Sequence, residues 1–192
     1  MPDCSEPSLP AAMKHLLCCH PGSPCASVWA VEASARLAEG GGLAVSYRLY
    51  GDPAQIRIPE TTSPSTADGL WRHTCLEAFV AAVDRPEYRE FNFSPSGQWA
   101  SYRFSAGRQR DFGFLPPGAP QVAFRRCADG FCLDALIGPE LLPGGATLNI
   151  GLTAVIEARD GSKSYWALTH CAAQPDFHLR QSFSLTLERP TP

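Results

Sequence analysis

Hydrophobic and polar residues alternate along much of the chain, which is typical of β-strands whose two faces meet different surroundings. The alternation is clearest in residues 88–93 and 99–104, which a Ser-Pro-Ser-Gly turn separates. Before them lies an apolar run at 75–83, interrupted only by Glu77 and ended by an Asp-Arg-Pro segment in which proline offers no ladder donor. We therefore predict three consecutive antiparallel strands in this part of the chain.

Similar short strands are predicted before and after these three, because Gly- and Pro-containing turns recur between apolar segments. The sequence has 18 Pro and 16 Gly among 192 residues, and charged residues make up only 18%. We predict an all-β fold, an antiparallel β-sandwich of jelly-roll or immunoglobulin-like type with roughly ten short strands. The further strands are expected at residues 27–37, 43–50, 56–58, 121–126, 130–136, 147–158, 164–168 and 182–188.

The length fits a single domain, which we place at residues 13–192. Residues 1–12 are rich in Pro and Ser and are expected to be a disordered leader, with Met13 as a candidate alternative start. The net charge is −3 and the basic residues are scattered, so we expect no binding to nucleic acid. No apolar run is long enough to span a membrane and no signal peptide is recognised, so a cytoplasmic location is expected.

The two central strands carry a candidate ligand-binding surface. If they pair across their turn, we expect Glu90, Asn92, Trp99 and Arg103 on one side of the sheet. Carboxylate, amide and guanidinium groups hydrogen-bond hydroxyl groups, and an indole covers the C–H face of a sugar. Trp99 is our first choice for that platform and Trp71 the second. The alternatives are an exposed Glu90–Arg103 ion pair and aromatic residues that only fill the core.

Histidine and cysteine are concentrated near both ends of the domain. Cys18, Cys19, His20 and Cys25 form one group, and His170, Cys171, Asp176 and His178 form the other. Neither has the doubled CxxC spacing of a zinc site, and no loop has the clustered oxygen ligands that calcium prefers, so no metal site is assigned. If the two segments meet, His20, His170 and His178 converge on a metal; the alternative is that these histidines form hydrogen bonds that hold the chain ends.

The sequence predicts no catalytic residues. His73 and Cys75 are its closest local approach to a Cys–His pair, without a third orienting group, and no Gly-rich phosphate loop opens a helix. Free thiols are expected in a reducing compartment. Cys127 and Cys132 flank a possible Asp129-Gly130 hairpin turn, which would set them opposite each other at a distance that permits a disulfide bond.

Three stretches resemble the bacterial DOMON-like domains of the family 9 carbohydrate-binding-module superfamily. They are Leu70–Phe79 continued by Tyr88–Tyr102, Tyr165–His170 continued by Gln174–His178 and Ser182-Phe183, and a shorter match at Cys19-His20-Pro21. The resemblance implies a β-sandwich that binds a small ligand, and both sugar and haem are ligands in the wider superfamily.

We therefore predict a ligand-binding domain without catalytic activity, with a carbohydrate or other polyol favoured as the ligand. The residues proposed to bind it are Trp71, Glu77, Glu90, Asn92, Trp99, Arg103, His170, Asp176 and His178. Haem is an alternative, with His170 or His178 as its ligand. A sandwich-fold enzyme is another, and it would gather titratable groups with perturbed pKa values in one cleft. A partner-binding module would instead lack a deep pocket.

Overall fold

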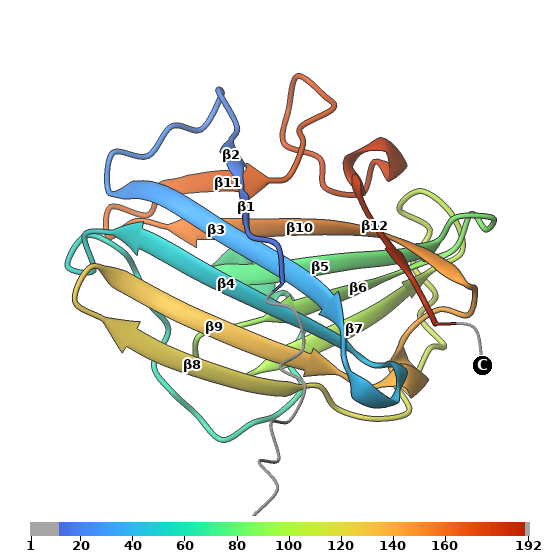
Figure 1. The fold of residues 1–192 in the computed structure, drawn as a ribbon. Helices are drawn as coiled ribbons and strands as arrows, with labels where there is room; N and C mark the ends of the chain where they lie inside the picture. The colour runs from blue at the N-terminus through green and yellow to red at the C-terminus, as the bar shows by residue number, and fades with distance from the viewer. Residues whose placement is uncertain (1–11, 191–192) are drawn as a thin grey trace, which may run out of the picture.

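Two antiparallel sheets pack face to face in the computed structural model, which describes residues 12–190 (Figure 1). These residues form twelve strands and four 3-10 turns but no α-helix, which confirms the predicted antiparallel β-sandwich. The predicted leader lies outside the described residues except for Ala12. None of the helices among residues 12–190 is long and apolar enough to cross a membrane.

The first sheet has five strands in the order β1, β3, β4, β9, β8. Their bounds are β1 His15–Leu16, β3 Val28–Leu37, β4 Leu43–Gly51, β9 Gly130–Ile137 and β8 Gln121–Cys127. The second sheet has the order β2, β11, β10, β5, β6, β7, with β12 also paired to β10. Its strands are β2 Cys18–Cys19, β11 Lys163–Ala167, β10 Thr147–Glu157, β5 Cys75–Ala82, β6 Tyr88–Phe93, β7 Trp99–Phe104 and β12 Leu185–Glu188.

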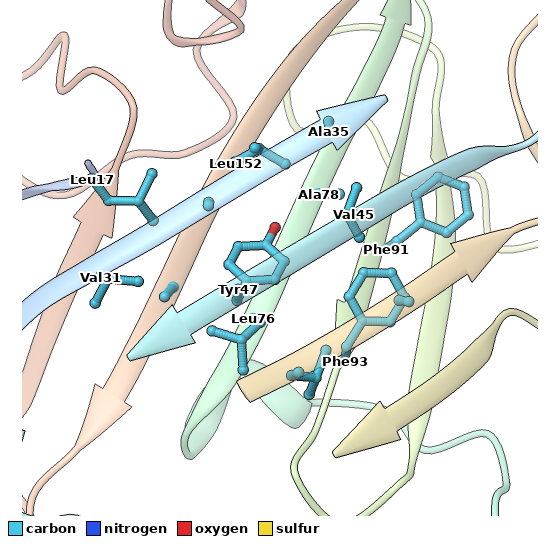
Figure 2. Packing of buried hydrophobic residues seen from close by; sticks show 14 of the residues in the cluster. Leu17, Val31, Ala35, Val45, Tyr47, Leu76, Ala78, Phe91, Phe93 and Leu152 are labelled. Atoms are coloured by element: carbon cyan, nitrogen blue, oxygen red, sulfur yellow. The ribbon is translucent and has the colours of Figure 1, made fainter. Parts of the chain in front are cut away.

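The main hydrophobic core lies between the sheets, where alternate residues of each strand point inward. Figure 2 shows Val45 and Tyr47 of β4 in one cluster with Leu76 of β5 and Phe91 of β6. Tyr47 is buried, and its hydroxyl donates a 2.6 Å hydrogen bond to the carbonyl oxygen of Glu77. This bond satisfies a polar group inside the core and ties the first sheet to the second at the strand that carries Glu77.

A second cluster covers the outer face of the seven-stranded sheet. Phe79 of β5 and Tyr88 of β6 belong to it, together with Phe177 and Phe183 from the segment that connects β11 to β12. This connecting segment, residues 168–184, leaves from and returns to strands that pair with the same neighbour, β10. It therefore lies over the outer face of the sheet, which remains partly open beside it.

The structure corrects two local predictions. Ile56 makes only an isolated bridge to Ala158, so residues 56–58 do not form a strand. At the tip of the β8–β9 hairpin Cys127 pairs with Gly130, and Cys132 therefore lies opposite Arg125 rather than opposite Cys127. The turn residues are therefore Ala128 and Asp129, one position earlier than the predicted Asp129-Gly130 turn. The two thiols are free, with their Sγ atoms 3.7 Å apart.

Candidate functional site

A pocket of about 340 Å³ opens on the outer face of the seven-stranded sheet, between the segments 105–111 and 168–178. Strands β5, β6 and β7 supply its floor, because their outward-pointing residues are adjacent in the ladder. The 3-10 turn η2 (Leu70–Arg72), β10 and β11 also contribute. Thirteen residues line it: Trp71, Glu77, Phe79, Glu90, Tyr102, Phe104, Arg108, Arg110, Val155, Tyr165, Pro175, Phe177 and His178.

Two buried carboxyl groups form the polar floor. Glu90 pairs with Phe79 in the ladder, while Glu77 pairs with Asn92, so the two acids are diagonal neighbours on one face. Glu77 is 2% exposed and Glu90 is 5% exposed. The Oε2 atom of Glu77 accepts a 3.2 Å hydrogen bond from the Thr153 hydroxyl, and Oε1 of Glu90 accepts one of 2.9 Å from Asn92 Nδ2.

Burial makes both acids weaker than exposed glutamates. Removal from water raises the pKa of Glu90 to about 7, against the opposing effects of the Asn92 hydrogen bond and the nearby Arg110 and Arg108. The pKa of Glu77 is raised well above its ordinary value, first by burial and then by the charge of Glu90. The floor therefore holds two weakened acids, and Glu90 changes charge close to neutral pH.

His178 lies beside Glu90 as a neutral imidazole. Burial lowers its pKa to about 4, and its Nε2 atom is 3.7 Å from Glu90 Oε2. The Tyr88 hydroxyl oxygen accepts a 3.1 Å bond from the Arg108 backbone N–H and lies 2.8 Å from His178 Nδ1. In the tautomer with the proton on Nε2, the Tyr88 hydroxyl donates to Nδ1 and the Nε2–H lies on the side of Glu90; in the other tautomer Nδ1–H donates to the hydroxyl oxygen.

Two arginines form the rim, and each is held by an aspartate. Arg108 donates a 2.7 Å bond to Asp176 Oδ1, and its backbone is left-handed with φ 57°, a conformation uncommon outside glycine. Arg110 lies 3.3 Å from Asp68 Oδ1, and its guanidinium lies 4.1 Å from the centre of the Tyr102 ring. Because these aspartates balance the arginines, the pocket has no strong net positive charge.

Aromatic side chains make the remaining walls. Phe79 and Phe104 are buried, with the edge of the His178 ring close to both, at centroid distances of 5.3 and 5.0 Å. Trp71 is different, since 49% of its surface is exposed at the pocket mouth. An exposed indole over a floor of hydrogen-bonding groups matches the amphipathic character of a sugar, which has C–H faces and hydroxyl edges.

The structure brings together four of the nine predicted ligand-binding residues: Trp71, Glu77, Glu90 and His178 all line the pocket. Two others support them from behind. Asn92 is fully buried and donates to Glu90, while Asp176 accepts from Arg108 and from the His178 backbone N–H.

Trp99 and Arg103 are on the opposite side of the sheet, so their predicted shared face with Glu90 is wrong. Phe93 pairs with Trp99 and Glu90 pairs with Tyr102, which places Trp99 in the core between the sheets. The side-chain period of a strand is two, so a one-residue change of register exchanges the faces. Tyr102, which pairs with Glu90, is the residue of β7 that lines the pocket beside it.

His170 also lies outside the pocket lining. Its ring packs edge-on against His20 at 4.8 Å, and its Nε2 atom is 2.9 Å from the Cys18 carbonyl oxygen. His20 Nε2 is 3.3 Å from the Ala172 carbonyl oxygen. The first and last segments do meet, but His178 is elsewhere, and residues 12–190 contain no group of three potential metal ligands. The geometry supports the alternative in which histidines hold the chain ends.

The predicted ligand-binding set missed the other nine lining residues: Phe79, Tyr102, Phe104, Arg108, Arg110, Val155, Tyr165, Pro175 and Phe177. Phe79 follows Glu77 by two positions, so strand alternation alone was a sufficient signal. The arginines and Phe177 come from irregular segments, whose path the alternation does not determine.

The fold and the pocket define a β-sandwich with a cavity of a size typical of small-ligand sites. No protein-family model matches the chain, and no characterised protein matches it in sequence. Solved structures do match. A candidate carbohydrate-binding protein from Bacteroides uniformis superimposes with a TM-score of 0.66 at 15% identity, over 92% of this chain and 86% of that one.

A family 9 carbohydrate-binding module from Caldicellulosiruptor kristjanssonii, solved in complex with cellotriose, is also similar. Its TM-score is 0.61 at 10% identity, over 92% of this chain and 82% of that chain. A family 9 module from the same organism in complex with glucose gives 0.55 at 9% identity, over 83% and 75%. The chain therefore has the fold of a family 9 carbohydrate-binding module.

Proposed function

We propose that this protein binds a carbohydrate in the pocket on its seven-stranded sheet. The observation that carries the proposal is the combination of an exposed indole, Trp71, with a buried floor of hydrogen-bonding groups in one cavity. The likeness in fold to carbohydrate-binding modules supports it. We further propose that the chain is of the DOMON-like branch, which the resemblance of its central strands supports.

In this site Trp71 covers a C–H face of the sugar, while Glu77, Glu90 and His178 hydrogen-bond its hydroxyl groups. A protonated carboxyl donates, an ionised carboxylate accepts, and a neutral imidazole has one donor and one acceptor nitrogen, so the floor matches hydroxyls that both donate and accept. Arg108 and Arg110 supply further donors at the rim. The walls contribute apolar area that excludes water from these bonds.

Haem is supported less well as the ligand. The nitrogens of His178 are directed to the Tyr88 hydroxyl and toward Glu90, and a flat apolar macrocycle would cover the free oxygens of two carboxyl groups without hydrogen-bonding them. His170 lies outside the pocket lining and is bonded to the Cys18 carbonyl. A haem titration without a saturable Soret shift is the expected result.

The binding proposal is tested by calorimetry of the intact protein with glucose, cellotriose, galactose, mannose and xylose. Trp71→Ala is expected to weaken binding by about tenfold or more, equivalent to roughly 1.4 kcal/mol. Trp29→Ala is the matched control, because Trp29 is also exposed, at 65%, but belongs to β3 of the other sheet. Binding of none of these sugars, or equal losses in both variants, would contradict the proposal.

A further inference from the structure

The two acids of the pocket floor are placed to act on a bound sugar. We propose that Glu77 and Glu90 form a proton donor–acceptor pair that catalyses the ring opening and closure of a reducing sugar, and so interconverts its two anomers. This inference rests on the proposed carbohydrate site, and it adds a reaction to binding.

The first support is geometric. Glu77 and Glu90 occupy diagonal positions on neighbouring strands, and such residues have Cβ atoms about 7 Å apart. Both line the same cavity. Flexible carboxyl groups at this separation reach the two oxygens on one anomeric carbon, the exocyclic hydroxyl and the ring oxygen. A single sugar ring can therefore contact both acids at once.

Each of the two acids also has one carboxyl oxygen without a hydrogen bond to the part of the chain that the structure describes. Glu77 is 2% exposed, yet among the described residues only Thr153 donates to its side chain, so its Oε1 atom is left for a ligand. Oε2 of Glu90 has only the 3.7 Å contact with His178. Neither oxygen is among the fully enclosed polar atoms that lack a partner, so both are open to the cavity, where a ligand can reach them.

The third support is the difference between the two environments. Asn92 lies directly across the ladder from Glu77, and its buried Oδ1 atom has no hydrogen-bond partner among residues 12–190. An unpaired amide oxygen directly across the ladder disfavours a carboxylate at Glu77, because two acceptors would then face each other. Glu90 instead accepts from the Asn92 amide and has two arginines nearby, which favour its ionised form. One acid is thus kept protonated while the other can accept a proton.

The reaction needs no further reactant. The Glu90 carboxylate takes the proton of the anomeric hydroxyl, and the O–H electron pair forms the C=O bond of the open-chain aldehyde. The bond from the anomeric carbon to the ring oxygen breaks, and that oxygen keeps the pair and takes the proton of Glu77. After rotation about the bond to the neighbouring carbon, the reverse transfers close the ring and restore both acids.

The test follows the optical rotation of freshly dissolved α-D-glucose, with α-D-galactose, α-D-mannose and α-D-xylose in parallel, in the presence of the intact protein. We expect a saturable acceleration over buffer. Methyl α-D-glucoside cannot open its ring, and it should bind and inhibit. Glu90→Gln and Glu77→Gln keep the side-chain shape, and each should lose about 100-fold or more in rate, since general acid–base catalysis contributes 10²–10⁴-fold.

Calorimetry with methyl α-D-glucoside separates binding from chemistry. A sugar that binds but changes anomer at the uncatalysed rate would refute the catalytic inference and leave the binding proposal standing. Failure of cellotriose and of all four monosaccharides to bind would remove both. If near-ultraviolet circular dichroism shows that a variant is misfolded, the pH profile of the wild-type rate decides instead. The rate should rise as Glu90 ionises near pH 7 and fall as Glu77 loses its proton. A rate that does not change with pH would refute the pair.

The pH profile of the rate depends on the ionisation of Glu90, which several charged and titratable groups influence. Those that face it are Glu77 from β5, Tyr88 from β6, Tyr102 from β7, His178 from the 168–184 segment, Arg108 and Arg110 from the segment after β7, and Asp68 before η2. Tyr88 and Tyr102 have raised pKa values through burial, and the pKa of His178 lies near 4. The pKa of about 7 belongs to Glu90, so we assign the rise of the rate near pH 7 to its ionisation.

Discussion

Replacing Glu90 by glutamine should make the protein more stable at pH 8 but not at pH 4. In the native state burial raises the pKa of Glu90 to about 7, compared with 4.5 for an ordinary glutamate. Below pH 4 the carboxyl is protonated in both states and its stabilising contribution is fully present. As the pH rises from 4.5 to 7, the unfolded chain releases the proton first, so the native state loses stability.

The size of this effect follows from the difference between the two pKa values. At 1.36 kcal/mol per pH unit, the gap between 4.5 and about 7 corresponds to about 3 kcal/mol of lost stability above pH 7. Because Glu90 is only 5% exposed, solvent screening does not greatly reduce this figure. Glutamine cannot ionise, and its amide oxygen can still accept the hydrogen bond from Asn92. The variant also relieves Glu77 of the neighbouring negative charge, which acts in the same direction.

The assay is urea unfolding followed by tryptophan fluorescence at pH 4 and at pH 8. The free energy of unfolding of Glu90→Gln, minus that of the wild type, should increase by about 3 kcal/mol between the two pH values. Glu60→Gln, at an exposed position, controls for the loss of one acidic residue. An equal difference for Glu90→Gln at both pH values would refute the assignment of a buried, weakly acidic group.

Three further predictions concern other parts of the fold. Trp99→Ala should lower the free energy of unfolding by about 3–5 kcal/mol, because it opens a cavity between the sheets; a loss below 1 kcal/mol would contradict its place in the core. Cys127 and Cys132 should lose reactivity toward iodoacetamide together under mild oxidation, whereas Cys127→Ser should leave Cys132 reactive. His170→Ala should cost about 1 kcal/mol, the value of one hydrogen bond, and unchanged urea midpoints would argue against this tie between chain ends.

The alternation of residues was sufficient to predict the sandwich and most of its strands, because burial on one face imposes a period of two. The predicted ligand-binding set included Glu77 and Glu90, and both line the pocket. It did not predict that Tyr102 rather than Trp99 faces Glu90, since that depends on which residues pair across a five-residue loop from Ser94 to Gln98. Hydrogen bonds within that loop, from Ser94 N–H to the Gln98 carbonyl, set this register.

The remaining parts of the pocket could not be derived from local pattern. Phe177 and His178 follow an irregular segment, and their positions depend on packing against Phe79 and Tyr88, which are distant in sequence. The same is true of Arg108, whose left-handed backbone is held in place by the Tyr88 hydroxyl and by Asp176. Long-range contacts of this kind carry no signature in a single sequence.

Strand β10 pairs with both β11 and β12 along one edge, and this arrangement affects how the protein can acquire a new ligand specificity. Thr153 pairs with Ala167 at the end of β11, and Ile150 pairs with Leu185 at the start of β12, so the segment between them begins and ends at nearby points of a single strand. A loop anchored in this way can lengthen at little entropic cost, because its closure depends only weakly on length. Insertions between Leu168 and Ser184 can therefore reshape the pocket wall without disturbing the sheet, which makes this loop the natural place to vary or redesign ligand choice.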